Sequence, residues 1–136
     1  MDTVVYCDGG ARGNPGPAAA AFVVKQNNKT IFQHGQAIGI ATNNIAEYTA
    51  VLLSLRWLAQ NKIQSSSLTY ILDSELVTKQ LNGDYKIKND KLKTLAIEIR
   101  EALKVIDIPV TFKHVKREFN KDADSLVNKT LDEQTV

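Results

Sequence analysis

Two acidic residues each follow a short apolar run, a position at which sheet proteins often carry their functional groups. Asp8 follows residues 3–7, and Asp73 follows residues 68–72. If these runs are adjacent parallel strands, the two carboxylates emerge side by side, and their charges repel unless a cation lies between them. Oxygen ligands without thiolates or a histidine cluster favour Mg²⁺ or Mn²⁺ over zinc. The pair therefore predicts a metal-dependent phosphoryl-transfer site.

Taken singly, both residues also have structural explanations. Asp8 precedes Gly9-Gly10, and an aspartate in that position is common in turns. Asp73 stands where an N-terminal helix cap is expected, although Ser74 already suits that role. The pair is therefore more informative than either member.

Two further acidic positions lie near predicted helix starts. Glu47 falls in the first turn of a long helical segment, where the helix dipole alone favours an acid by about 0.3–1 kcal/mol. Asp122 and Asp124 lie near the start of the last helix, and the same explanation covers both. Spacing leaves the choice between Asp122 and Asp124 open.

The elements that must position these residues alternate in type. Strands are predicted over 3–7, 18–25, 30–39, 68–72 and 110–115, and helices over 45–62, 74–81, 90–104 and 120–131. Short turns make the first three strands an antiparallel meander, and helical crossovers make the last two parallel to the first. We expect an α/β fold whose five-stranded mixed sheet combines a three-strand antiparallel meander with two parallel strands and flanking helices.

A glycine-rich stretch separates the first two predicted strands. Residues 9–17 hold four glycines and two prolines, which predicts an irregular loop. The stretch matches neither the phosphate-loop pattern nor the dinucleotide-binding pattern. It predicts a flexible loop with few side chains beside Asp8, which a polymer backbone can approach closely.

The composition sets broad limits. The 136 residues suit one domain, 1–136, and the net charge of +2 is compatible with nucleic acid without arguing for it. A single cysteine, Cys7, excludes an intrachain disulfide and suits a reducing compartment. There is no signal-peptide pattern and no apolar stretch of membrane-spanning length. We expect a cytoplasmic monomer without a membrane partner.

Several segments, in order and over nearly the whole chain, resemble those of type 1 ribonuclease H. They are Asp8–Pro17, Thr42–Glu47, Leu72-Asp73-Ser74, His114–Glu118 and Asn120–Asp124. The resemblance implies the ribonuclease H-like fold. It also implies an endoribonuclease that hydrolyses the RNA strand of RNA–DNA hybrids and leaves 5′-phosphate and 3′-hydroxyl ends.

The resemblance also assigns a site. It implies two Mg²⁺ ions bridged by Asp8, with Glu47, Asp73 and Asp124 completing the ligands and Mn²⁺ able to substitute. It thereby selects Asp124 over Asp122. His114 stands ten residues before Asp124, the family's spacing for a loop histidine that moves a proton and eases product release. The structural alternative for His114 is an ordinary residue at the end of the fifth strand.

Four polar residues are the implied substrate contacts. Asn14, Asn43 and Asn44 would lie along the minor groove near the RNA strand, where the 2′-hydroxyl distinguishes RNA from DNA. Thr42 would contact a DNA-strand phosphate. Residues 42–44 are also good helix caps, and the two roles can coexist.

The chain departs from the family pattern in three places. Ile40 stands where other members often carry an arginine of the DNA-phosphate pocket. Residues 83–89 are too few for the basic handle that some members insert, and we expect no separate N-terminal hybrid-binding domain. Four nearby lysines either replace the handle as phosphate contacts or form a solvated face: Lys86, Lys88, Lys91 and Lys93. We therefore expect weak, strongly salt-dependent hybrid binding.

Two other functions are compatible with this fold. One is a nuclease specific for double-stranded RNA or for a nucleic-acid structure. The other is a nucleic-acid-binding module without catalysis, although all four carboxylates are present.

Overall fold

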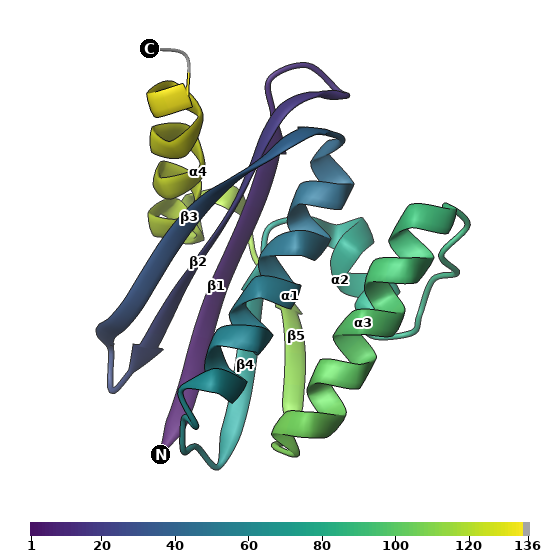
Figure 1. Ribbon diagram of the computed structural model, residues 1–136. Helices are drawn as coiled ribbons and strands as arrows, with labels where there is room; N and C mark the ends of the chain where they lie inside the picture. The colour runs from purple at the N-terminus through teal and green to yellow at the C-terminus, as the bar shows by residue number, and fades with distance from the viewer. Residues whose placement is uncertain (135–136) are drawn as a thin grey trace.

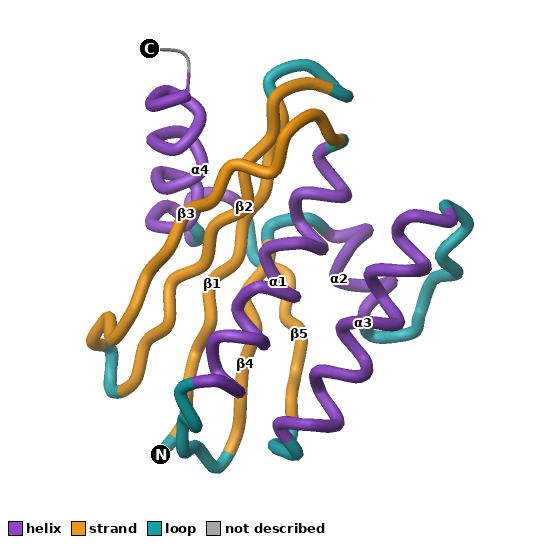
Figure 2. Tube along the Cα trace, in the orientation of Figure 1, coloured by secondary structure: helices purple, strands orange, loops and turns teal. Residues whose placement is uncertain are grey.

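The computed structural model describes residues 1–134 of the chain. Its strands are β1 (Asp2–Ala11), β2 (Gly16–Gln26), β3 (Lys29–Ala41), β4 (Ser67–Leu72) and β5 (Val110–His114). Its helices are α1 (Asn43–Gln60), α2 (Glu75–Leu81), α3 (Asp90–Ile106) and α4 (Lys121–Gln134), with a short 3₁₀ turn η1 (Arg117–Phe119) before α4. Figures 1 and 2 show one sheet with helices on both of its faces.

The sheet has the predicted topology. Its strand order is β3-β2-β1-β4-β5. The β1–β2 and β2–β3 pairs are antiparallel, and the β1–β4 and β4–β5 pairs are parallel. The expected α/β fold with a mixed five-stranded sheet is confirmed.

Strand β2 shows how the two faces of the sheet are covered. Alternate residues of a strand point to opposite faces. Ala20, Phe22 and Val24 therefore pack in the main core with α1, whereas Ala19 and Ala21 pack under α4. Helix α1 lies centrally over the first face, with α3 beside it, and α4 lies on the other face (Figure 1).

Helix α1 is the buried helix that the sequence predicts. Thr42 caps its start, where the Thr42 hydroxyl accepts a hydrogen bond from the Ile45 amide at 3.2 Å. Apolar side chains then occupy most of its circumference, including the fully buried Val51 and Leu55. Such a helix must be enclosed by the sheet and by another helix.

The glycine-rich stretch is more regular than predicted. Strand β1 continues to Ala11 and β2 begins at Gly16, so the prediction of an irregular loop over 9–17 was wrong in extent. The reason is that Asp8, Gly9 and Gly10 pair in register with the alanines of β2. Small residues on both strands allow the antiparallel ladder to extend beyond the apolar run.

Two site residues differ from their expected local positions. Asp8 lies inside β1, paired with Ala21, and not at the point where the chain leaves the sheet. Glu47 lies in the second turn of α1, because the helix begins at Asn43 and not at Ile45. Among the described residues, no helix is both long enough and apolar enough to cross a membrane.

Candidate active site

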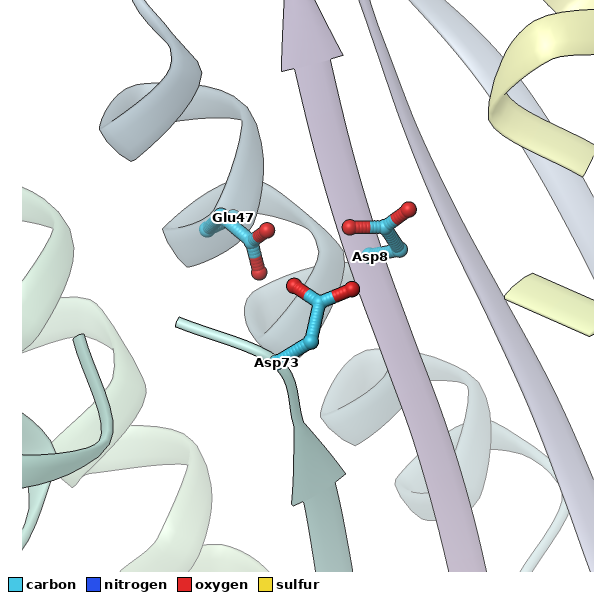
Figure 3. Close-up of side chains that lie close together, drawn as sticks. All are labelled: Asp8, Glu47 and Asp73. Atoms are coloured by element: carbon cyan, nitrogen blue, oxygen red, sulfur yellow. The ribbon is translucent and has the colours of Figure 1, made fainter. Parts of the chain in front are cut away.

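Three carboxylates from three different elements meet in the structure. Asp8 comes from β1, Glu47 from α1, and Asp73 directly follows β4. Each offers an oxygen, and these oxygens all lie within 4.8 Å of one another. Figure 3 shows the three side chains turned toward a common centre.

A close approach between β1 and α1 brings Glu47 to Asp8. A Cβ atom at Gly9 would overlap the backbone of Ala46 and Glu47, so α1 rests directly on the β1 backbone at this point. Only a residue without a side chain allows this approach. Gly9 therefore lets two acids that lie 39 positions apart in the sequence share one site.

The third acid is placed by the end of the parallel pairing. Strands β1 and β4 are in register from Asp2 and Ser67 up to Tyr6 and Ile71. Asp73 follows the end of β4, while β1 continues beyond that point. The predicted proximity of Asp8 and Asp73 is thus present, although one of them lies within its strand.

The cluster is buried and incompletely hydrogen-bonded. Asp8 is 6% exposed and Glu47 is 5% exposed. Glu47 Oε2 and Asp73 Oδ2 are buried and have no hydrogen-bond partner in the described part of the chain. Buried carboxylate oxygens are normally paired or bound to a metal ion. Converging oxygens that lack donors therefore fit a hard divalent cation such as Mg²⁺ or Mn²⁺.

The electrostatics point the same way. Burial raises the pKa of Asp8 from 3.8 to about 7, and the charges of Asp73 and Asp124 add to the effect. Burial and the charge of Asp8 likewise raise the pKa of Glu47 well above its usual range. Burial raises the pKa of Asp73 as well, and the positive charge of Arg117 partly offsets this. A cation would relieve the repulsion and favour the ionised forms.

Asp122 and Asp124 occupy different surroundings. Asp124 lies near enough to Asp8 to help raise the pKa of Asp8, although it is outside the group of three. The Asp122 side chain is 63% exposed and forms an ion pair with Lys25 of β2 at 3.2 Å. The structure therefore places Asp124 beside the cluster and Asp122 on the surface.

His114 is not in a loop. It is the last residue of β5, exposed and paired in register with Leu72. The fifth strand predicted over 110–115 already includes this residue, and the observed strand ends at it, alongside the end of β4. His114 is near enough to Glu75 to contribute, as a minor cause, to the lowered pKa of that acid. A catalytic role for His114 stays a prediction.

The predicted substrate contacts gather at the start of α1. Asn14 Oδ1 accepts from the Asn43 amide at 3.0 Å, and Asn43 Oδ1 accepts from the Ala11 amide at 2.8 Å. These bonds tie the loop between β1 and β2 to the N-terminus of α1, which Thr42 caps. Asn44 is next in the chain and partly buried. The capping interpretation is thus correct for Thr42, and the contact roles stay predictions.

The residues at which the chain departs from the family pattern lie on the surface. Ile40 is 69% exposed on the edge strand β3. The four lysines of the segment around the start of α3 are all exposed: Lys86, Lys88, Lys91 and Lys93.

One buried residue at the site was not predicted from the sequence. Asn120, at the start of α4, is 1% exposed, and its Nδ2 donates to the Cys7 carbonyl of β1 at 2.8 Å. An asparagine at a helix start is normally explained as a cap, so its type and position carried no sign of a contact 113 positions away.

Comparisons with known proteins agree with this geometry. Residues 6–130 match a protein family described as reverse transcriptase-like. The chain is 39% identical over 129 residues to ribonuclease HI of Halobacterium salinarum, covering 94% of this chain and 63% of that protein. It is 35% identical over 134 residues to a bifunctional protein of Mycobacterium tuberculosis, covering 97% of this chain and 36% of that protein.

One solved structure has a similar fold over its whole length. LC11-RNase H1, in complex with an RNA/DNA hybrid, superposes with a TM-score of 0.93 at 35% identity. The match covers 98% of this chain and 99% of that chain. By contrast, the chain spans 63% of the length of the Halobacterium protein and 36% of the length of the Mycobacterium protein.

Proposed function

The chain belongs to the type 1 ribonuclease H family, and on this premise we propose that it is a metal-dependent endoribonuclease that hydrolyses the RNA strand of RNA–DNA hybrids. The observation that carries the proposal is the convergence of Asp8, Glu47 and Asp73 within 4.8 Å of one another. The complex of LC11-RNase H1 with an RNA/DNA hybrid supports the substrate class.

We assign the residues of this chain as follows. Asp8, Glu47, Asp73 and Asp124 would hold the metal, as two Mg²⁺ ions with Mn²⁺ as a substitute. When bound, the two ions supply the activation of a water molecule and the stabilisation of the leaving 3′ oxygen, which yields 5′-phosphate and 3′-hydroxyl products. The low exposure of Asp8 and Glu47 keeps bulk water from competing for the same oxygens.

We assign recognition of the hybrid to four polar residues beside the carboxylates, which we call the polar rim: Asn14, Thr42, Asn43 and Asn44. Asn14, Asn43 and Asn44 would face the RNA strand, and Thr42 a phosphate of the DNA strand. The bonds that join Asn14 to Asn43, and Asn43 to Ala11, hold this rim at a set distance from Asp8, which lies three residues before Ala11 in β1. His114 would assist by moving a proton during product release. These positions support discrimination through the 2′-hydroxyl.

The direct test is cleavage of end-labelled substrates. The protein is incubated with an RNA–DNA hybrid, duplex RNA and duplex DNA of one sequence, with Mg²⁺, Mn²⁺ or a chelator. We expect cleavage of the RNA strand of the hybrid alone, with both metals and not with the chelator. Activity that persists in the chelator would contradict the metal mechanism. Cleavage of duplex RNA at a similar rate would favour the alternative nuclease, and binding without cleavage would favour the non-catalytic module.

The remaining expectations concern the whole protein. We propose that residues 1–136 act as one ribonuclease H domain and as a monomer. We also propose a cytoplasmic location, because the single cysteine, Cys7, is buried and unpaired and needs no oxidising compartment.

A further inference from the structure

We propose that Asn120 is a positioning residue that holds three carboxylate-bearing segments in register for metal binding. It would thereby act through Asp8, Asp73 and Asp124 without contacting the substrate. The proposal rests on the proposed function for its catalytic consequence, but its structural part concerns metal binding alone.

The side-chain amide of Asn120 binds the β1 backbone directly after the pairing of β1 with β4 ends. The last residues of β1 and β4 in parallel register are Tyr6 and Ile71. Asn120 Nδ2 donates to the carbonyl of the next residue of β1, Cys7, at 2.8 Å. The bond is buried, and a buried bond of this kind is costly to lose because it leaves a carbonyl unpaired. It fixes the β1 backbone directly before Asp8.

The backbone of the same residue starts the helix that carries Asp124. The Asn120 carbonyl accepts a hydrogen bond from the Asp124 amide at 3.2 Å, and the Asn120 amide donates to the Arg117 carbonyl at 2.9 Å. Asn120 therefore joins η1 to α4 and sets where the first turn of α4 begins. One residue thus links the strand of Asp8 to the helix of Asp124.

Asn120 also lies against the third carboxylate. Its side chain contributes to lowering the pKa of Asp73, which burial raises. Its own Oδ1 is buried without a hydrogen-bond partner in the described part of the chain. Among the described residues, the other buried side-chain atoms without a hydrogen-bond partner are Glu47 Oε2 and Asp73 Oδ2. The buried side-chain acceptors without a partner among the described residues therefore belong to the acidic cluster and to Asn120 beside it.

A neutral amide suits this position better than the alternatives. An acid would add another negative charge to a cluster whose members already raise one another's pKa. An apolar side chain would leave the Cys7 carbonyl without its donor. Asparagine supplies the donor without the charge.

The test compares Asn120→Ala with Asn82→Ala. Asn82 is the control because its Nδ2 also donates to a strand carbonyl, that of Phe112 in β5, at 3.2 Å, in a partly buried bond that involves none of the acidic residues. Mn²⁺ affinity is measured calorimetrically without substrate, and kcat and KM are measured on an RNA–DNA hybrid. Thermal unfolding in a chelator reports the stability of each variant.

For Asn120→Ala we expect about tenfold weaker Mn²⁺ binding and about tenfold lower kcat, a loss of about 1.4 kcal/mol each, with KM within about twofold of the wild type. For Asn82→Ala we expect a lower unfolding temperature with unchanged Mn²⁺ affinity and kcat. Wild-type Mn²⁺ affinity and kcat in Asn120→Ala would overturn the proposal and leave Asn120 a structural residue.

Two further outcomes have to be distinguished: a variant that does not fold and a wild type that does not cleave the hybrid. If Asn120→Ala does not fold, Asn120→Leu, which keeps a side chain of similar length but has no donor for the Cys7 carbonyl, is measured in the same way, and wild-type Mn²⁺ affinity in it would overturn the proposal. If the wild type binds Mn²⁺ but cleaves no hybrid, the proposed function fails, while weaker Mn²⁺ binding by the Asn120 variant still supports the positioning role.

Discussion

At the scale of single residues, the acidic cluster of Asp8, Glu47 and Asp73 suits metal binding but should lower the stability of the metal-free protein. Asp8 and Glu47 are almost fully buried and close to other carboxylates, so their ionised forms are disfavoured unless a cation is bound. A site of this kind binds a divalent ion by relieving its own repulsion. The same residues should therefore destabilise the metal-free protein.

Asp8→Asn should separate these two effects. Loss of a central ligand removes several kcal/mol of transition-state stabilisation, which at about 1.4 kcal/mol per tenfold corresponds to at least a thousandfold lower cleavage rate. The metal-free variant should nevertheless be more stable than the wild type at pH 8, by about 1–3 kcal/mol, because a buried charge is gone. Hybrid cleavage and chemical denaturation measure the two quantities.

Asp122→Asn is the matched control for that change. Asp122 is exposed and paired with Lys25, so its loss should leave cleavage unchanged and alter stability by less than about 1 kcal/mol. Equal loss of activity in both variants would contradict the assignment of Asp124 over Asp122.

His114→Ala tests the proposed proton transfer. Because His114 is exposed at the end of β5, its removal should not disturb the core. We expect cleavage slowed by about tenfold to a hundredfold but not abolished, as for a group that assists proton transfer. His34→Ala, which changes the exposed histidine of β3, should have no effect. An unchanged rate in His114→Ala would make this residue an ordinary strand residue.

At the scale of elements, the site depends on how closely α1 rests on β1. The β1 backbone at Gly9 contacts the α1 backbone at Ala46 and Glu47, without room for a Cβ atom. Glycine is required here for close packing and not for an unusual backbone conformation. Gly10, the next residue, has ordinary space, because an added Cβ would lie 3.5 Å from Val127 Cγ1.

Gly9→Ala and Gly10→Ala should therefore differ sharply. We expect Gly9→Ala to lower the free energy of unfolding by about 3 kcal/mol or more through overpacking, and to weaken Mn²⁺ binding by displacing Glu47. Gly10→Ala should change stability by less than about 1 kcal/mol and leave Mn²⁺ binding intact. Similar losses of stability in the two variants would show that α1 does not rest on Gly9.

At the scale of the whole molecule, the site makes folding depend on pH and metal. The pKa of Asp8 is raised from 3.8 to about 7 in the folded protein, so the folded state holds a proton that the unfolded chain has released. This contribution is fully present below about pH 4 and is lost as the pH rises through about 7. Glu47 acts in the same direction.

In a chelator, the free energy of unfolding should therefore fall by about 2–4 kcal/mol between pH 5 and pH 8, since each extra proton held by the folded state contributes about 1.4 kcal/mol per pH unit. Added Mg²⁺ should stabilise the protein more at pH 8 than at pH 5, since protons compete with the ion. Urea denaturation at the two pH values, with and without Mg²⁺, measures both effects. Metal-free stability that is constant or rises over this range would contradict the electrostatics of the cluster.

Hybrid binding by the whole molecule should depend strongly on salt. Without a basic handle, the exposed lysines near the start of α3 are the candidate phosphate contacts. We expect K86A/K88A to lower the slope of log affinity against log salt by about 1–2, as measured by fluorescence anisotropy. K29A/K104A, which changes exposed lysines at the β2–β3 turn and at the end of α3, should leave the slope unchanged. Affinity that hardly changes with salt would contradict the expectation for the wild type.

The sequence by itself determined the order and type of the elements, the cap at Thr42, and the position of Asp73 behind β4, because apolar periodicity and capping depend on near neighbours. Resemblance to a family added Glu47 and the choice of Asp124. The end of β1 was not predicted correctly, since pairing with β2 extends the strand beyond its apolar run. The turn of α1 that carries Glu47 was also not predicted correctly, because the helix begins at Asn43 and not at Ile45.

Tertiary structure alone decided which groups converge. It brought Asp8 and Glu47 together over the bare backbone of Gly9, and it separated Asp124 from the ion-paired Asp122. It also brought Asn120 to the Cys7 carbonyl across 113 positions. The physical reason is that convergence depends on which backbones can approach and which buried polar atoms remain unpaired, and both are properties of the packed molecule.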